Sequence, residues 1–292
     1  MIKRIIPVML SAILLMTGCA NTKSETKDTK ELTKLTYSNL IDEKTQNEIR
    51  DILIENKIDK KQADYFIKLV KNYNGKSDIN KLKTSKKGFT SIKTQQVPYD
   101  EVYLEEKWDP NKLNYMDFNC RLTAFSIFKN YIKSEDKFTG DSTRLVFDKD
   151  AINNNPISKF SKEDTDKFIN LYSAVKVENT QNVNKHAQAI KKEWEKRKIS
   201  FVDNKNISMI NVFLHEPEDN EVFVGHAGLL LQTKDGLLFI EKYASALPFQ
   251  VSKFKNKLEL KKYLMDRLDN DTSGNGSSKP IIMENNELIN IE

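Results

Sequence analysis

Apolar positions recur with helical spacing in the first third of the chain. In "DEKTQNEIRDILIENKI" (42–58) and "DKKQADYFIKLVKNYN" (59–74), apolar side chains return every three or four residues, as on the buried face of a helix. Asp42 and Asp59 precede the two runs at the positions of helix N-caps. The pattern predicts a helical hairpin that has to pack on the rest of the chain to bury its apolar faces.

The middle of the chain alternates between loop and helix. Residues 75–118 are mostly loop by composition, since glycines and prolines interrupt them. "CRLTAFSIFKNYI" then predicts a helix that begins at or just before Cys120, with Asn119 as its N-cap. Two more polar helices are expected at 161–175 and 182–197.

Beyond Ile199 the period changes to that of strands. Residues 207–215, 221–232 and 236–245 are rich in Val, Ile and Phe and are separated by turn residues. Asp235-Gly236 between two apolar runs is a strong hairpin signal. A final helix near 253–268 and an edge strand within 281–291 complete the pattern. The order predicts an α+β fold with an antiparallel sheet.

The start of the chain is a leader. Residues 1–18 run from two cations through an apolar stretch to small residues, which is typical of a secretory signal, and the run is short for a full span of ~20 residues. Met16-Thr17-Gly18-Cys19 resembles the lipobox of bacterial lipoproteins, which implies that Cys19 carries lipid and anchors the protein to a membrane. The charged stretch 20–34 then predicts a disordered tether.

Charge and motifs narrow the possible partners. The formal net charge is +5 for 292 residues, and loss of Lys3 and Arg4 with the leader reduces it by two, to +3, which is too mild to indicate nucleic-acid binding. The basic segment 81–93 is expected to be an exposed linker, with contact to an anionic envelope as the alternative. The sequence has no Gly-rich phosphate loop, no HExxH and no CxxC, so we expect no metal and no cofactor.

Cys120 is a candidate nucleophile. If Cys19 is lipidated, Cys120 has no partner for a disulfide. A thiol at a helix N-terminus or beside an imidazolium has a lowered pKa, although an isolated buried cysteine also serves as a small core residue. Of the three histidines, His186 lies on a charged helix and is expected at the surface, and His215 ends a strand. His226, in "GHAGLLL", is the preferred partner.

This order of cysteine, helix, histidine and strand resembles the papain-like superfamily, above all the NlpC-type endopeptidases and CHAP amidases. "YSNL", "FNCRLTAF", "GHAGLLL" and "EKYASALPFQ" also resemble an uncharacterised family of lipoproteins from low-GC Gram-positive bacteria, known as a domain of unknown function. The resemblance implies Cys120 as nucleophile, His226 as base and a third residue that orients the imidazole. Glu241 is the candidate for this role, with a salt bridge to Lys242 or a solvated strand face as its ordinary explanation.

Hairpin geometry leaves an alternative open for the orienting residue. If Asp235-Gly236 are the two turn residues, His226 faces Ser245, and Glu241 lies ~13 Å away along the strand at ~3.3 Å per residue. Ser245 is therefore the second candidate.

Supporting groups are expected just before and after the nucleophile. An oxyanion would be held by the N–H of Cys120 and by an upstream donor, for which Asn114, Tyr115 and Asn119 are near enough in sequence. Arg121 stands where NlpC-type enzymes have a small residue, and it either binds a substrate carboxylate or is simply exposed.

These inferences divide the chain into four segments. They are a signal peptide at 1–18, a lipidated cysteine and tether at 19–34, a helical hairpin and loop at 35–98, and a papain-like α+β domain at 99–292. The expected function is a membrane-anchored extracytoplasmic cysteine hydrolase that cleaves amide bonds of peptidoglycan or other envelope peptides. The alternative is a non-catalytic binding module in which Cys120 and His226 are core residues. A membrane-active factor has only the basic segment 81–93 in its favour.

Overall fold

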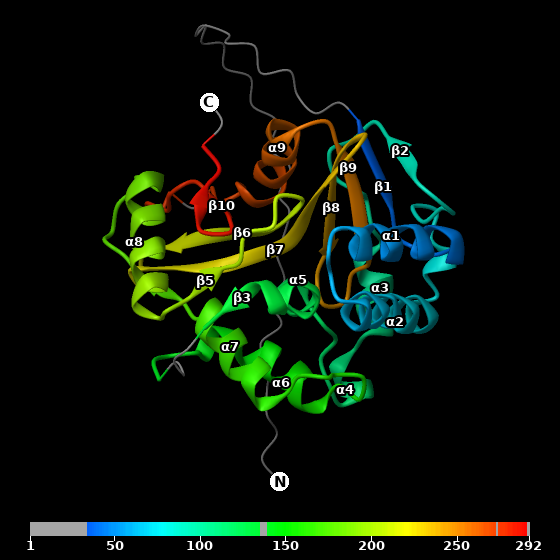
Figure 1. Ribbon diagram of the computed structural model, residues 1–292, viewed down its shortest axis with the longest axis horizontal. Helices are drawn as coiled ribbons and strands as arrows, with labels where there is room; N and C mark the ends of the chain where they lie inside the picture. The colour runs from blue at the N-terminus through cyan, green and yellow to red at the C-terminus, as the bar shows by residue number, and fades with distance from the viewer. Residues whose placement is uncertain (1–33, 135–138, 273, 291–292) are drawn as a thin grey trace, which may run out of the picture. The chain divides into compact units, whose positions relative to one another are not determined.

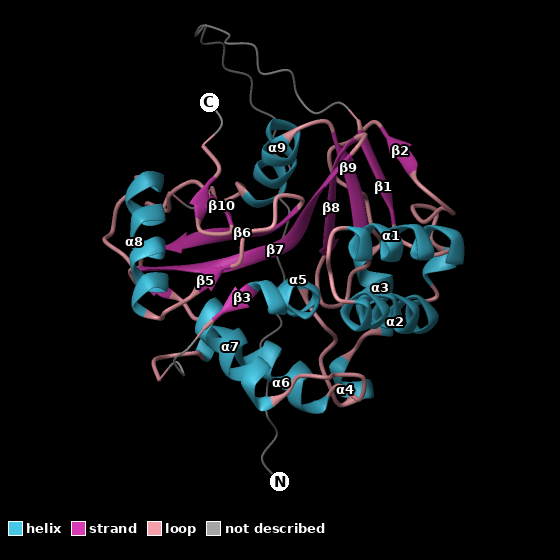
Figure 2. Ribbon diagram, viewed as in Figure 1, coloured by secondary structure: helices cyan, strands magenta, loops and turns pink. Residues whose placement is uncertain are grey.

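The computed structural model describes residues 34–134, 139–272 and 274–290 (Figure 1). The predicted signal peptide, Cys19 and all but the last residue of the predicted tether lie outside these residues. The described part combines an antiparallel sheet with helices on both of its faces, so the predicted α+β class is confirmed (Figure 2). Among the described residues, no helix has both the length and the apolar character that a bilayer crossing requires.

One sheet organises the described residues. Its strands follow the order β11-β10-β6-β7-β8-β9-β1-β2, and β4 pairs with the beginning of β7. The strands of this sheet are β1 (Leu35–Ser38), β2 (Thr90–Ile92), β4 (Val175–Lys176), β6 (Ile207–Glu216), β7 (Glu221–Thr233), β8 (Gly236–Lys242), β9 (Phe249–Phe254), β10 (Ile281–Glu284) and β11 (Glu287–Leu288). A separate pair is formed by β3 (Ile132–Lys133) and β5 (Ser200–Phe201).

The helices begin where side chains cap them. Asp42, Asp59 and Asn119 each accept a hydrogen bond from a main-chain N–H of the first turn, as predicted. The helices are α1 (Glu43–Glu55), α2 (Lys60–Ser77), α3 (Glu101–Lys107), α4 (Pro110–Leu113), α5 (Cys120–Phe128), α6 (Val146–Asn154), α7 (Lys162–Tyr172), α8 (Val183–Lys196) and α9 (Lys257–Leu268). Short 3-10 turns lie at Ile79–Lys81, Lys129–Tyr131 and Thr143–Leu145.

The two faces of the sheet carry different helices (Figure 1). On one face α9 packs Tyr263 and Leu264 into a cluster with Ile210 and Phe239. On the other face α5 lies against the sheet and α2 lies against α5, within a single large apolar core. Because α5 is enclosed in this way, every residue of it except Arg121 is buried. A helix buried on all sides holds its first residue at a fixed place over the sheet.

Several elements differ from the predicted ones. Residues 75–118, predicted as mostly loop, contain β2, α3 and α4, and residues 35–38 form a strand that pairs with β9. These strands and helices are three to seven residues long, so their apolar periodicity is too brief to detect. Helix α6 and strand β9 were also not predicted.

Candidate active site

The beginning of α5 lies in a gap along one edge of β7. On this edge β8 pairs with residues 228–233 of β7, and β4 pairs with Glu221 and Val222. In the described part of the chain, residues 223–227 of β7 therefore have no strand beside them on this edge. Between β8 and β4, the carbonyl of Val224 accepts from Arg121 Nη1 at 2.7 Å, and the N–H of Ala227 donates to the sulfur of Cys120. The first turn of α5 thus takes the place of a neighbouring strand.

A β-bulge places His226 at this gap. His226 is paired with Val212 of β6, while Val224 is paired with the next residue, Phe213, so Gly225 is the extra residue. A bulge bends its strand and redirects the neighbouring side chains. A Cβ on Gly225 would lie 2.4 Å from the side chain of Leu214, so a larger residue here would require Leu214 to move.

Cys120 is the first residue of α5 and its side chain is a free thiol with 7% of its surface exposed. Burial alone raises the pKa of the thiol. The charge and the hydrogen bond of His226 outweigh this effect together with Arg121 and the N–H of Ala227, so the pKa of Cys120 lies below its ordinary value. Both conditions for a reactive thiolate, a helix N-terminus and an adjacent imidazole, are therefore met.

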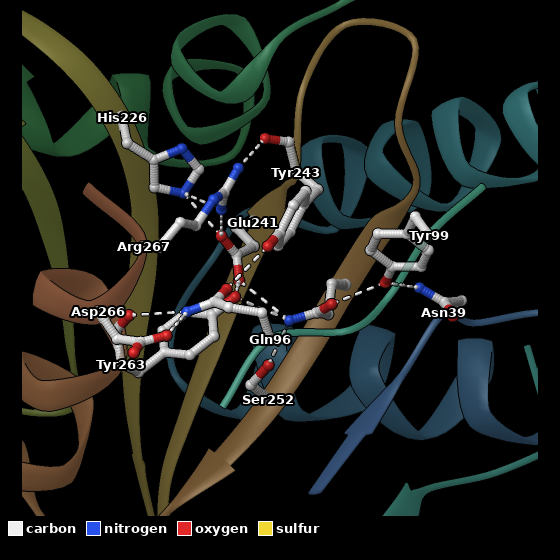
Figure 3. Close-up of polar contacts among 11 residues, drawn as sticks. Asn39, Gln96, Tyr99, His226, Glu241, Tyr243, Ser252, Tyr263, Asp266 and Arg267 are labelled. Atoms are coloured by element: carbon white, nitrogen blue, oxygen red, sulfur yellow. Dashed lines mark hydrogen bonds and ion pairs between the residues drawn. The ribbon is translucent and has the colours of Figure 1, made fainter. Parts of the chain in front are cut away.

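Glu241 orients the imidazole of His226 (Figure 3). His226 Nε2 lies 2.6 Å from Glu241 Oε2, so Nδ1 is the ring nitrogen that remains for the thiol of Cys120. Burial and the cation of Arg267 lower the pKa of His226, but the thiolate of Cys120 and the bond to Glu241 raise it further, to above its ordinary value. A raised imidazole pKa beside a lowered thiol pKa favours a thiolate–imidazolium pair.

The predicted separation of ~13 Å between His226 and Glu241 is wrong. Thr233 pairs with Gly236, so Lys234 and Asp235 are the two turn residues rather than Asp235 and Gly236. This register puts Glu241 opposite Gly228, on the same face as His226 and diagonal to it. Ser245, the alternative orienting residue, lies in the loop 243–248, and Glu241 occupies Nε2 in its place.

Three further residues hold the carboxylate of Glu241. Tyr263 donates its hydroxyl to Oε1 at 2.6 Å, Gln250 donates to the same oxygen at 3.2 Å, and Arg267 donates to Oε2 at 2.9 Å. Burial alone raises the pKa of Glu241, but His226, Arg267 and Tyr263 bring it below its ordinary value. Sequence reasoning missed these residues because tertiary packing of α9 and β9, rather than a motif, brings them to the site.

The predicted supporting side chains have other partners. Asn119 caps α5 with its oxygen and donates its amide to Asp148 at 2.7 Å, and the hydroxyl of Tyr115 bonds to Lys76. Asn114 is exposed, at a positive φ of 61°.

The structure also corrects the two expectations for Arg121. Its side chain forms a two-bond ion pair with the buried carboxylate of Asp148, at 2.6 and 3.0 Å, and holds the carbonyl of Val224. The guanidinium is therefore engaged within the protein instead of being free for a substrate carboxylate or simply exposed. It fastens α5 to the edge of β7.

An ion pair on the opposite face of the sheet connects the two halves of the site. Lys242, next to Glu241, is fully buried, and its Nζ lies 3.2 Å from Oδ2 of Asp117, three residues before Cys120. The ammonium also lies 3.5 Å from the ring centroid of Tyr73 and donates to a main-chain carbonyl. Burial lowers the pKa of Lys242 to about 8 and raises that of Asp117.

The other two histidines lie elsewhere and contact each other. The rings of His186 and His215 have centroids 4.4 Å apart, and both side chains are buried. The expectation that His186 is a surface residue is wrong, because α8 turns this side inwards, where His186 packs on His215 of β6. Among the described residues, no cluster of three or more His, Cys, Asp and Glu side chains is arranged to hold a metal ion.

Comparison with known proteins gives one family. The family described as a domain of unknown function (DUF4300) matches residues 36–289. No curated protein and no solved structure matches the chain.

Proposed function

The chain belongs to the DUF4300 family, whose function is unknown, and from this premise we propose that it is a membrane-anchored, extracytoplasmic cysteine hydrolase with a papain-like site. The observation that carries the proposal is the contact of Cys120, at the start of a buried helix, with His226, whose other nitrogen is bonded to Glu241. Peptidoglycan stem peptides or other envelope peptides are the proposed substrates. The leader pattern and Cys19 support the location.

The arrangement suits amide hydrolysis through a thioester. The thiolate of Cys120 would attack the carbonyl carbon, while the N–H groups at the start of α5 stabilise the oxyanion. The imidazolium of His226 would then donate its proton to the leaving amine as the C–N bond breaks. In the second half, neutral His226 would take a proton from water, which attacks the thioester; the C–S bond breaks and releases a carboxylic acid and the thiolate, so the thiolate–imidazolium pair is restored. Glu241 keeps the ring oriented throughout.

One observation favours a second candidate function. Cys120 is 7% exposed and His226 is 2% exposed, so little of either side chain is open to a substrate. A non-catalytic binding module would hold the same two residues as part of its core. The two functions differ in whether the thiol reacts in the folded protein.

The pH dependence of alkylation by iodoacetamide tests the proposal. The modified Cys120 peptide is quantified by mass spectrometry, so Cys19 does not interfere. A free thiol has a pKa of ~8.5 and is less than about 1% thiolate at pH 6. The wild type is expected to react at pH 6 at least about tenfold faster than His226→Ala, since the variant lacks the imidazolium. His226→Gln is the second variant should the alanine variant unfold.

Either outcome is informative. Fast alkylation at pH 6 that is lost in both histidine variants supports a thiolate–imidazolium pair. A thiol that reacts only after denaturation contradicts the hydrolase and supports the binding module.

A further inference from the structure

The last turn of α9 places an arginine against the His226–Glu241 pair (Figure 3). Arg267 Nη1 donates to Glu241 Oε2 at 2.9 Å and lies 3.5 Å from His226 Nε2. Its Nη2 donates to the main-chain carbonyl of Tyr243, and the guanidinium stacks 3.3 Å from the centroid of the same tyrosine ring. With 14% of the side chain exposed, the guanidinium is fixed by contacts on several sides.

A carboxylate alone would orient the imidazole but would also hold it as imidazolium. A buried negative charge beside Nε2 strengthens the protonated form of His226, whereas the proposed reaction needs the ring to lose its proton and regain it in each cycle. Arg267 acts in the opposite direction. Its charge lowers the pKa of His226 and that of Glu241.

The inference rests on the proposed function and concerns the same site. We propose that Arg267 is a positioning residue of the cysteine–histidine site, which fixes the carboxylate of Glu241 and neutralises its charge. Acting through Glu241, it keeps the imidazole of His226 able to exchange its proton.

The groups that face His226 come from three elements. They are Cys120 from α5, Glu241 from β8 and Arg267 from α9. Behind them, Arg121 acts on Cys120, Tyr263 bonds to Glu241, and Tyr243 lies against Arg267. Burial raises the pKa of both tyrosines, so they stay neutral. The carboxylate of Asp266, next to Arg267 in the chain, accepts instead from Gln96 at 2.8 Å. Arg267, which holds Glu241, is the cation whose charge lowers the pKa of His226.

Removal of the Arg267 charge should raise the pKa values of both His226 and Cys120. Without Arg267 the imidazolium of His226 becomes more stable, so its pKa rises. The thiolate of Cys120 loses an attractive cation, so its pKa rises too. The acid limb of the pH profile of alkylation follows the pKa of Cys120, and the alkaline limb follows that of His226. Both limbs should therefore move in the alkaline direction, by about one pH unit, and the alkylation rate on the acid limb should fall by about tenfold.

Arg267→Gln in the full-length chain tests this expectation. The chain has three histidines, so NMR titration of ¹³C-labelled imidazoles gives the pKa of His226 directly, with His226→Ala identifying its signal. Arg267→Lys restores the charge and should return the profile part of the way. Arg267→Met keeps the apolar packing on Tyr243 and is the second charge-removing variant.

Arg197→Gln is the matched control. Arg197, at the end of α8, is also buried, and it donates to the carbonyls of Asn170, Ser173 and Ala174 at the end of α7. Its loss should lower the free energy of unfolding and leave the pH profile of Cys120 in place. If the shift came from a general loosening of the fold, both arginine variants would shift the pH profile of alkylation by the same amount.

The outcomes separate the two proposals. An alkaline shift in Arg267→Gln or Arg267→Met, with none in Arg197→Gln, supports the role of Arg267. A folded Arg267 variant with the wild-type profile overturns it, and so does an equal shift in the control. If the wild type itself lacks fast alkylation at pH 6, it is the proposed function that fails.

Discussion

Replacement of Lys242 by methionine should destabilise the protein far more than loss of a surface lysine. The ammonium lies fully buried between the Asp117 carboxylate, at 3.2 Å, and the ring of Tyr73, at 3.5 Å. Lys242→Met fills a similar volume but leaves the buried carboxylate without its counter-ion. Breaking one side of a buried ion pair costs about 3–5 kcal/mol, so the free energy of unfolding should fall by about this amount.

The double variant Asp117→Asn/Lys242→Met separates the two contributions. Replacement of both partners removes the uncompensated charge, and such replacements are often neutral or stabilising. We expect the double variant to regain at least about 2 kcal/mol relative to Lys242→Met, which is a coupling that distant residues do not show. Urea denaturation at pH 7 can follow this by tryptophan fluorescence, since Trp108 stacks on Tyr73.

Lys162→Met is the control for the lysine side chain itself. Lys162 forms an ion pair with Asp166 at 2.7 Å on α7, but 82% of its side chain is exposed. Such pairs contribute about 0.3–0.5 kcal/mol, so this variant should stay close to the wild type. The reasoning is refuted if Lys242→Met unfolds at the same urea concentration as Lys162→Met, or if the double variant is less stable than Lys242→Met.

Three further predictions concern stability. Gly228→Ala would place a methyl group 2.3 Å from the Phe239 ring, so urea titration should show a loss of about 1–3 kcal/mol, and an unchanged midpoint would contradict the close packing. Asn119→Ala should cost about 1–2 kcal/mol in the same assay, and Asn119→Ser, which keeps the cap, should cost less. Burial lowers the pKa of His186 and His215, so the unfolded state binds more protons below pH 6.5; the free energy of unfolding should fall on acidification, and less so in a His186→Gln/His215→Gln chain.

The sequence was informative where the pattern is local and long. The helices around Cys120 and at 42–74, and the three central strands, follow from apolar periodicity and caps, and so does the place of Cys120 at a helix start. The register of the β7–β8 hairpin did not follow, because Asp-Gly marks a turn without saying which two residues span it. Gly236 has a φ of 121°, which glycine adopts without strain. A glycine therefore suits the position just after the two turn residues Lys234 and Asp235, and not only a position within the turn.

The surroundings of the site could not be predicted for a different reason. Arg267, Gln250 and Tyr263 reach Glu241 through packing of α9 and β9 on the sheet, and their spacing along the chain carries no signal. Arg121 was expected to face a substrate or solvent because its partner, Asp148, lies in a helix that periodicity had not revealed.

The neighbouring charges at the end of β8 have a consequence for the folding of the sheet. Glu241 and Lys242 point to opposite faces, one towards Arg267 and the other towards Asp117. A slip of β8 by one residue would exchange the two faces, so that Lys242 would meet Arg267 and Glu241 would meet Asp117. Each mispairing would bury two like charges together. The two residues thus select against misaligned strands, and the correct hairpin is the arrangement in which both charges are neutralised.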